Sequence, residues 1–253
     1  MFLEEILASV DKRAAAWQKE AEAIRARALL APPPRSLKQA LIGSPRMGVI
    51  AECKHRSPSK GWLADVYDPV AKARYYQAMG ASGISILTEP DYFAGSMEHL
   101  AQVRQAVDCP LLCKDFVRHP VQIYQARSHG ADAVLLIVRI IQNPGMLAEL
   151  HRLALELGME ALVEVHSETE LEVALALNPE LLGVNNRDLD SFETRLEFSQ
   201  QIAPRIPDSV VAVSESGIRS AADLEWLRGL GYRAVLIGEA LMRGGTVLED
   251  IRR

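Results

Sequence analysis

The chain has 253 residues, 49% of them hydrophobic, and a formal net charge of −5. This length suits one large domain or two small ones with a sizeable core, and the mild negative charge argues against a nucleic-acid-binding protein, which normally presents a basic face. No apolar run approaches the roughly 18 residues of a membrane helix, and acidic residues stand where a signal peptide would be basic and then apolar. We therefore expect a cytoplasmic protein with neither nucleic acid nor membrane as partner.

Cysteine and histidine spacing gives no sign of a metal site. The three cysteines, Cys53, Cys109 and Cys113, are odd in number and form no C-x-x-C pair, so neither a disulfide framework nor a zinc site is expected. The six histidines show no H-x-x-x-H or H-E-x-x-H spacing. We predict buried, reduced cysteines and no bound metal.

The first 45 residues form a predicted helical extension. Apolar residues recur at steps of three and four over residues 2–30, which predicts one amphipathic helix. Residues 32–34 are prolines and end it. A second apolar cluster at Leu37, Ala40 and Leu41 precedes the first strand.

From Gly48 onward, short apolar runs alternate with segments of helical periodicity. Predicted strands cover residues 48–54, 83–87, 110–114, 131–138, 160–165, 181–185, 209–213 and 233–237. Predicted helices cover residues 69–79, 96–106, 120–128, 146–157, 168–177, 196–202 and 221–230, with a last helix to about residue 252. Eight strand–helix units predict an α/β protein, a single (β/α)₈ TIM barrel over the whole chain. A doubly wound open sheet is the alternative, but it usually carries a Gly-rich first turn, whereas the turn here is RSPSKG.

Polar residues stand where the predicted strands end. In the stretch GVIAECKHRSPSKG, alternation places Ile50, Glu52 and Lys54 on one face of the first strand. Active sites of TIM barrels lie at the carboxyl ends of the strands. A structural ion pair would explain one such pair, but the same position recurs on other strands. The residues concerned are Glu52, Lys54, Glu89, Lys114, Glu164, Asn185, Arg187 and Glu215.

Two further features suggest a ligand. Ser216-Gly217 and Gly238-Glu239 follow the last two strands, where many barrels bind phosphate through backbone N–H groups. Phe93 and Phe116 stand beside charged residues at the predicted mouth. They either stack on a flat substrate ring or merely pack between loops.

The segments AECKHRSPSKG, TEPDYFAGS, LLCKDFV, LVEVHSETEL, GVNNRDL, VSESGI and LIGEALM resemble, in order and spacing, the indole-3-glycerol phosphate synthase family of tryptophan biosynthesis. The resemblance runs from about Leu37 to Met242, and the N-terminal helix is similar to the family's extension. It implies a carboxy-lyase that closes the indole ring of 1-(2-carboxyphenylamino)-1-deoxyribulose 5-phosphate with loss of carbon dioxide and water, without metal or organic cofactor. Because the chain ends at Arg253, we expect a monofunctional enzyme, monomeric or weakly self-associating.

The resemblance also implies roles for individual residues. Lys114 would protonate the ketone oxygen, while Lys54 would pair with the substrate carboxylate and act as acid in the dehydration. Glu52 and Glu164 are both candidates for the proton acceptor. Asn185, Glu215 and Ser216 would orient the hydroxyl and charged groups. The substrate pocket would be lined by Ser57, Pro58, Phe93, Phe116, Arg187 and Leu189, and the phosphate would be held at Gly217, Gly238 and Glu239.

Two expectations concern single groups. A general acid works best with a pKa near the working pH, so we predict that cationic and apolar neighbours lower the pKa of Lys114. Glu239 stands where other family members carry Ser. We expect it to offer its backbone N–H and to turn its carboxylate away, toward a neighbouring loop, because a carboxylate facing the pocket would repel phosphate.

Two other functions are compatible with the same residues. A phosphate-binding barrel could use Lys114 or Lys54 as a Schiff base, as aldolases do. The barrel could also be an inactive binding or scaffold protein, although such a protein has no need of acids and bases converging at its mouth.

Overall fold

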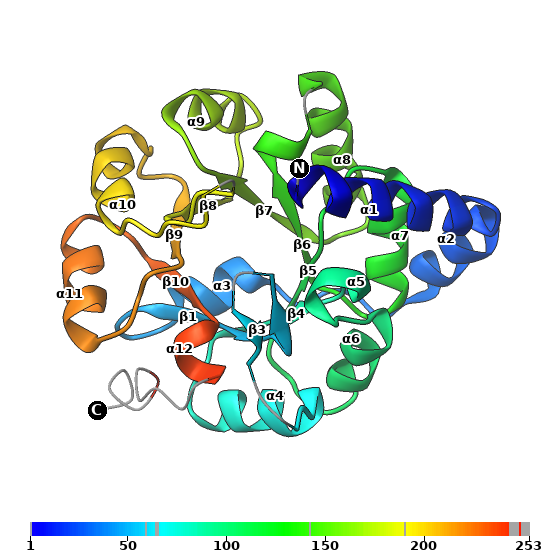
Figure 1. The fold of residues 1–253 in the computed structure, drawn as a ribbon, viewed down its shortest axis with the longest axis horizontal. Helices are drawn as coiled ribbons and strands as arrows, with labels where there is room; N and C mark the ends of the chain where they lie inside the picture. Colours follow the sequence, from blue (N-terminus) through cyan, green and yellow to red (C-terminus); the bar gives the residue numbers. More distant parts are fainter. Residues whose placement is uncertain are drawn as a thin grey trace.

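The computed structural model describes residues 2–58, 60–63, 66–141, 143–189, 191–242 and 248. Eight parallel strands close into a barrel in the order β1-β10-β9-β8-β7-β6-β5-β4 (Figure 1). The barrel strands are β1 (Gly48–Cys53), β4 (Gly83–Leu87), β5 (Leu111–Lys114), β6 (Ala133–Ile137), β7 (Glu160–Val165), β8 (Leu181–Asn185), β9 (Val211–Glu215) and β10 (Ala234–Ile237). The predicted TIM barrel is therefore confirmed, and the open sheet is excluded because β1 pairs with both β4 and β10.

Helices surround the barrel (Figure 1). They are α1 (Phe2–Gln18), α2 (Ala21–Leu30), α3 (Leu37–Ile42), α4 (Pro69–Ala78), α5 (Pro90–Phe93), α6 (Met97–Arg104), α7 (Pro120–Ser128), α8 (Pro144–Glu156), α9 (Glu168–Leu175), α10 (Glu197–Ile202), α11 (Ala221–Gly229) and α12 (Glu239–Met242). Short 3₁₀ helices span Val138–Ile140 and Ala203–Arg205, and a two-stranded hairpin, β2 (Arg56–Ser57) and β3 (Gly61–Trp62), follows β1. Beyond Met242, most of the predicted last helix lies outside the described residues. None of the helices in the described ranges is both long and apolar enough to cross a membrane.

Residues 2–30 of the N-terminal extension form two helices, so the prediction of a single helix there is wrong. Lys19 and Glu20 separate α1 from α2, although no proline or glycine stands there. One straight helix of 29 residues would be about 44 Å long and would run past the barrel. Helices α1 and α2 both lie against α7 (Figure 1). The break lets Ala14 of α1 and Ile24 of α2 pack together against Val121 of α7. Tertiary burial therefore decides the break.

The strand before the last also differs from its prediction. It was expected at residues 209–213, but β9 runs from Val211 to Glu215. Its register against β8 pairs Leu181 with Val211 and Asn185 with Glu215. Glu215 is therefore the last residue of a strand rather than part of the loop after it, and the barrel wall holds its backbone.

A continuous core fills the barrel and the layer between strands and helices. Ile50, Ile84 and Leu112 are fully buried, as are the helix residues Leu100 and Ile123. All three cysteines are free, and Cys53 and Cys113 are buried. This packing gives the strand ends a rigid frame, which the polar residues of the mouth require.

Candidate active site

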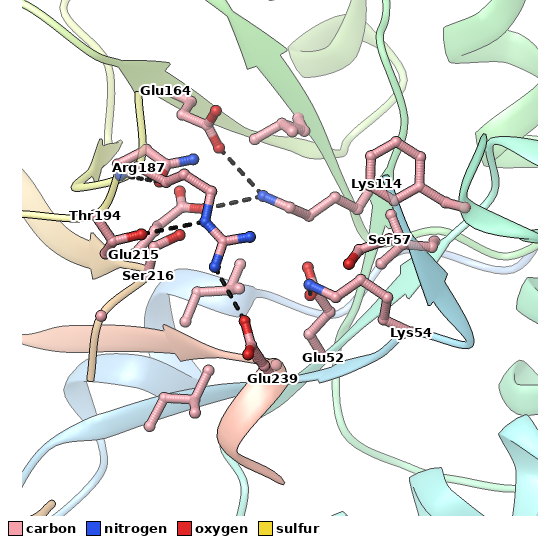
Figure 2. Close-up of a pocket in the computed structure, with 18 of the residues that line it drawn as sticks. Glu52, Lys54, Ser57, Lys114, Glu164, Arg187, Thr194, Glu215, Ser216 and Glu239 are labelled. Atoms are coloured by element: carbon pink, nitrogen blue, oxygen red, sulfur yellow. Dashed lines mark hydrogen bonds and ion pairs between the residues drawn. The ribbon is translucent and has the colours of Figure 1, made fainter. Parts of the chain in front are cut away.

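A cavity of about 340 Å³ opens at the carboxyl ends of the strands. Apart from Glu89, it brings together the residues that the sequence placed at the site: Glu52, Lys54, Ser57, Pro58, Phe93, Lys114, Phe116, Glu164, Asn185, Arg187, Leu189, Glu215, Ser216, Gly217, Gly238 and Glu239. Figure 2 shows the charged members converging from different strands. The fold therefore places these side chains around one cavity.

Lys114 lies at the centre of the charged group (Figure 2). Its Nζ donates to Oε2 of Glu215 at 2.9 Å and to Oε2 of Glu164 at 3.1 Å. All three side chains are mostly buried and come from β5, β7 and β9. Barrel closure is what brings these strands' ends together, since the three residues are far apart in the chain.

The pKa of Lys114 is raised, so the prediction of a lowered pKa is wrong. Burial alone would lower the pKa of this amine, but the carboxylates of Glu164, Glu215 and Glu52 stabilise the ammonium and reverse the shift. The neighbours that the prediction assumed were cationic and apolar. The side chains that surround the Nζ are acidic instead.

Glu164 and Glu215 both accept from the Lys114 ammonium, and the pKa values of their carboxyl groups differ from the ordinary value in opposite directions. Burial alone would raise the pKa of Glu164, but Lys114 and then His166 hold it below the ordinary value. Burial, and after it the negative charge of Glu164, raise the pKa of Glu215. Two close carboxylates cannot both ionise easily. The pKa values of the two carboxyl groups beside Lys114 are therefore shifted in opposite directions.

Lys54 and Glu52 form a second pair on the β1 side of the cavity. The Lys54 ammonium donates to Oε1 of Glu52. Burial alone would raise the pKa of Glu52, but Lys54 and Lys114 lower it. A Cβ at Gly238 would clash with Oε1 of Glu52, so glycine is required there for the carboxylate to keep its place.

Arg187 and Glu239 face each other across the mouth (Figure 2). Arg187 Nη2 lies 3.1 Å from Oε2 of Glu239, and its Nε donates to Thr194 at 3.3 Å. The Glu239 carboxylate thus reaches Arg187 in the loop after β8. It lines the cavity, so the expectation that it turns away from the pocket is wrong, and the Arg187 guanidinium balances its charge there.

The loop after β9 has an unusual backbone. Ser216 has φ 66° and Gly217 has φ 84°, both in the left-handed region that a serine rarely adopts. Asn186, which the sequence analysis overlooked, donates to the carbonyl oxygens of Glu215 at 2.8 Å and Ser216 at 3.1 Å. Asn186 is buried and holds this strained loop in place. The doublet Asn185-Asn186 was the available signal, since alternation sends only its first member inward.

Phe93 and Phe116 lie in the predicted place, whereas Glu89 does not. Phe93 and Phe116 both line the cavity, and their ring centroids are 5.9 Å apart. Glu89, expected at the mouth, instead caps α5 by accepting the backbone N–H groups of Asp91 and Tyr92, at 3.0 and 2.8 Å. The Glu89 carboxylate therefore caps a helix and does not line the cavity.

Other lining residues had no clear sequence signal. The apolar wall includes Leu87, Leu135, Ile137, Leu236 and Ile237. Further lining residues are Asp115, Phe192, Thr194, Ile218 and Arg219 from loops and Ala240 from α12. Within the described ranges, no three His, Cys, Asp or Glu side chains gather in a way that would hold a metal ion.

Known proteins of one family are similar to this chain over most of its length. The family model described as indole-3-glycerol phosphate synthase matches residues 3–253. The chain is similar to the indole-3-glycerol phosphate synthase of Parafrankia sp. (strain EAN1pec), with 46% identity over 245 residues, 96% of this chain and 91% of the relative. It is 50% identical over 223 residues to the Carboxydothermus hydrogenoformans protein of the same name, covering 85% of this chain and 84% of that one. The Mycolicibacterium smegmatis protein of that name shares 47% identity over 222 residues, or 88% and 81% of the two chains.

Proposed function

Because the chain belongs to the indole-3-glycerol phosphate synthase family, we propose that its cavity closes the indole ring of 1-(2-carboxyphenylamino)-1-deoxyribulose 5-phosphate. The reaction releases carbon dioxide and water and yields indole-3-glycerol phosphate, a step of tryptophan biosynthesis. One observation carries the assignment of roles: the Lys114 Nζ lies between Glu164 and Glu215 in a cavity that also contains the Lys54–Glu52 pair. The cavity thus offers acids and bases in pairs.

Ring closure needs an acid at the ketone. As the aromatic carbon that bears the carboxylate attacks the ketone carbon, negative charge develops on the ketone oxygen, and the Lys114 ammonium donates its proton there. The raised pKa of Lys114 keeps that proton on the amine until an oxyanion, a stronger base, is formed. The adjacent carboxylates of Glu164 and Glu215 hold the ammonium in position.

Decarboxylation and dehydration follow at the β1 side. Lys54 pairs with the substrate carboxylate until it leaves as carbon dioxide, which returns the electron pair to the ring. Lys54 then protonates the departing hydroxyl, and a glutamate removes the proton from the neighbouring carbon to complete the indole. Glu52, already paired with Lys54, and Glu164, paired with Lys114, are both suited to accept it. Glu52→Gln and Glu164→Gln distinguish them, because loss of the acceptor lets the decarboxylated intermediate accumulate.

The remaining groups hold the two ends of the substrate. The loops at Gly217 and Gly238, with Arg187 nearby, suit the phosphate, because their backbone N–H groups donate to anions. Phe93 and Phe116 suit the aromatic ring. The walls between them carry further proposed contacts: Ser57, Pro58, Asn185, Leu189, Ser216 and the backbone N–H of Glu239. No organic cofactor enters this scheme.

The direct test follows indole fluorescence during turnover of the anilino-ribulose phosphate. We expect Lys114→Ala to fold, as judged by near-ultraviolet circular dichroism, and to lower kcat by at least about 100-fold. Lys38→Ala is the matched control. Lys38 pairs with Glu180, and its backbone N–H donates to Glu160, the first residue of β7. It therefore lies at the amino ends of the strands, opposite the cavity. A Lys114→Ala variant with wild-type kcat would overturn the scheme.

Borohydride trapping and the turnover assay separate the two alternatives. A covalent adduct trapped by borohydride with the substrate would indicate a Schiff-base enzyme, whereas the proposed mechanism forms none. Folded wild-type protein without turnover would indicate a scaffold.

The cytoplasmic location and a monomeric or weakly associating state belong to the same proposal, and the free thiols of Cys53 and Cys113 support a reducing compartment.

A further inference from the structure

His166 lies directly behind Glu164 and has no part in the steps above. It follows β7 immediately, and its side chain is 2% exposed. Its Nε2 is 3.2 Å from Oε1 of Glu164, and its Nδ1 is 3.5 Å from Oε2 of Glu170 on α9. An imidazole between two carboxylates is unusual enough to require an explanation.

The two oxygens of Glu164 face different partners. Oε2 accepts from Lys114 inside the catalytic cavity, and Oε1 faces the imidazole. His166 also lines a second cavity, of about 320 Å³, which Asn185 shares with the first. The carboxylate of Glu164 is thus held between a cation in the reaction site and a ring outside it.

We propose that His166, as an imidazolium, is a positioning residue that keeps Glu164 ionised and turned toward Lys114. The inference rests on the proposed function, since Glu164 is one of the two candidate proton acceptors. A base must be ionised before it can accept, and Glu215 competes with Glu164 for the same ammonium. The His166 imidazolium is a second cation beside Glu164 and favours the ionised form of Glu164 over that of Glu215.

The surroundings of His166 support a charged ring. Burial alone would lower the pKa of His166, but Glu164 and Glu170 raise it to about 9. Oε2 of Glu170 also accepts the backbone N–H of His166 at 2.7 Å, which holds the ring between the two acids. The other charged groups of the second cavity are Asp188, Glu193 and Arg195. Arg195 pairs with Glu193, and Arg139 pairs with Asp188, so these charges balance one another. Glu164 and Glu170 are the acids that face the ring and favour imidazolium.

The first experiment measures the pH dependence of kcat in His166→Gln. Loss of the imidazolium raises the pKa of Glu164, so the acid limb of the profile should move to higher pH by about one unit or more, with KM little changed. His151→Gln is the matched control, because His151 is a buried histidine on α8 outside the cavity lining. An acid limb that stays at the wild-type position in a folded His166→Gln would overturn the proposal. A purely structural role would lower stability without moving that limb.

The second experiment needs no turnover. Nitrogen-15 spectra of labelled histidine, with His166 identified by its loss in His166→Asn, should show a doubly protonated ring at pH 7. In Glu164→Gln its titration should move to lower pH by about one unit or more, because the coupling between two groups is reciprocal. A neutral His166 ring at pH 7 would refute the proposal whatever the enzyme does. If the wild type makes no indole while His166 titrates as expected, the proposed function is wrong, but the electrostatic coupling between His166 and Glu164 is still supported.

Discussion

Arg13 on α1 donates from Nη2 to both carboxylate oxygens of Asp115, at 2.7 and 2.8 Å. Asp115 is the residue after Lys114, and its Oδ2 also accepts from Thr88 at 2.9 Å. Arg13 Nη1 lies 3.6 Å from Glu89, which caps the helix that carries Phe93. One arginine of the N-terminal extension thus connects two segments that border the catalytic cavity.

Arg13→Ala should destabilise the protein by about 3 kcal/mol, because it leaves the buried carboxylate of Asp115 without its cation. Urea unfolding at neutral pH measures this change. Arg152→Ala is the control, since Arg152 makes an exposed pair with Glu156 and should cost less than about 1 kcal/mol. Equal costs for the two variants would mean that the Arg13–Asp115 pair behaves as a surface contact.

Gly238→Ala should lower kcat by roughly tenfold or more without unfolding the protein, because the added Cβ would displace the carboxylate of Glu52. Indole fluorescence measures the effect. Gly229→Ala provides the contrast: its Cβ meets nothing within 4 Å, and Gly229 lies in α11. That variant should keep its activity and gain about 0.5–1 kcal/mol of stability. A Gly238→Ala enzyme with unchanged kcat would show that Glu52 has room to move.

Glu239→Gln should bind inorganic phosphate roughly threefold more tightly or better, measured by titration calorimetry. The substitution removes a negative charge from the cavity wall and releases Arg187, which lies 3.1 Å away, toward an anion. Glu225→Gln on α11 is the control, because Glu225 pairs with Arg228 at the surface. Weaker phosphate binding in Glu239→Gln would mean that the carboxylate serves mainly to hold Arg187 in its binding position.

Glu215→Gln should become more stable relative to wild type as the pH rises. The folded pKa of Glu215 is raised, by burial first and then by Glu164, so the protein favours its protonated form. That contribution is complete below the ordinary pKa of about 4.3 and is lost as the pH rises through the raised folded value. Glutamine keeps the neutral form throughout.

Melting temperatures between about pH 5 and about pH 9 test this sign. The difference between Glu215→Gln and wild type should grow by roughly 3 °C or more toward the alkaline end. Glu149→Gln, at an exposed position on α8, should show a constant difference from wild type. A Glu215→Gln difference that stays constant or shrinks with pH would contradict the raised pKa.

Local patterns were sufficient for the barrel and for most of the charged residues in its cavity. Alternation within β1 placed Glu52 and Lys54 on one face, and both line the cavity. The same reasoning placed Glu89 at the mouth, where it is instead a helix cap. Whether a carboxylate serves a ligand or three backbone N–H groups depends on the turn that follows it, and the strand pattern carries no information on that turn.

The sequence by itself determined the alternation of strands and helices and which polar residues lie near the strand ends, because side-chain alternation and helical periodicity are local properties of the chain. The break at Lys19 and the raised pKa of Lys114 were decided by the tertiary structure alone. The break depends on burial against α7, and the pKa depends on how close Glu164 and Glu215 come once the barrel closes. Coulomb energy varies with distance and burial, and both are set by strands that are far apart in the chain.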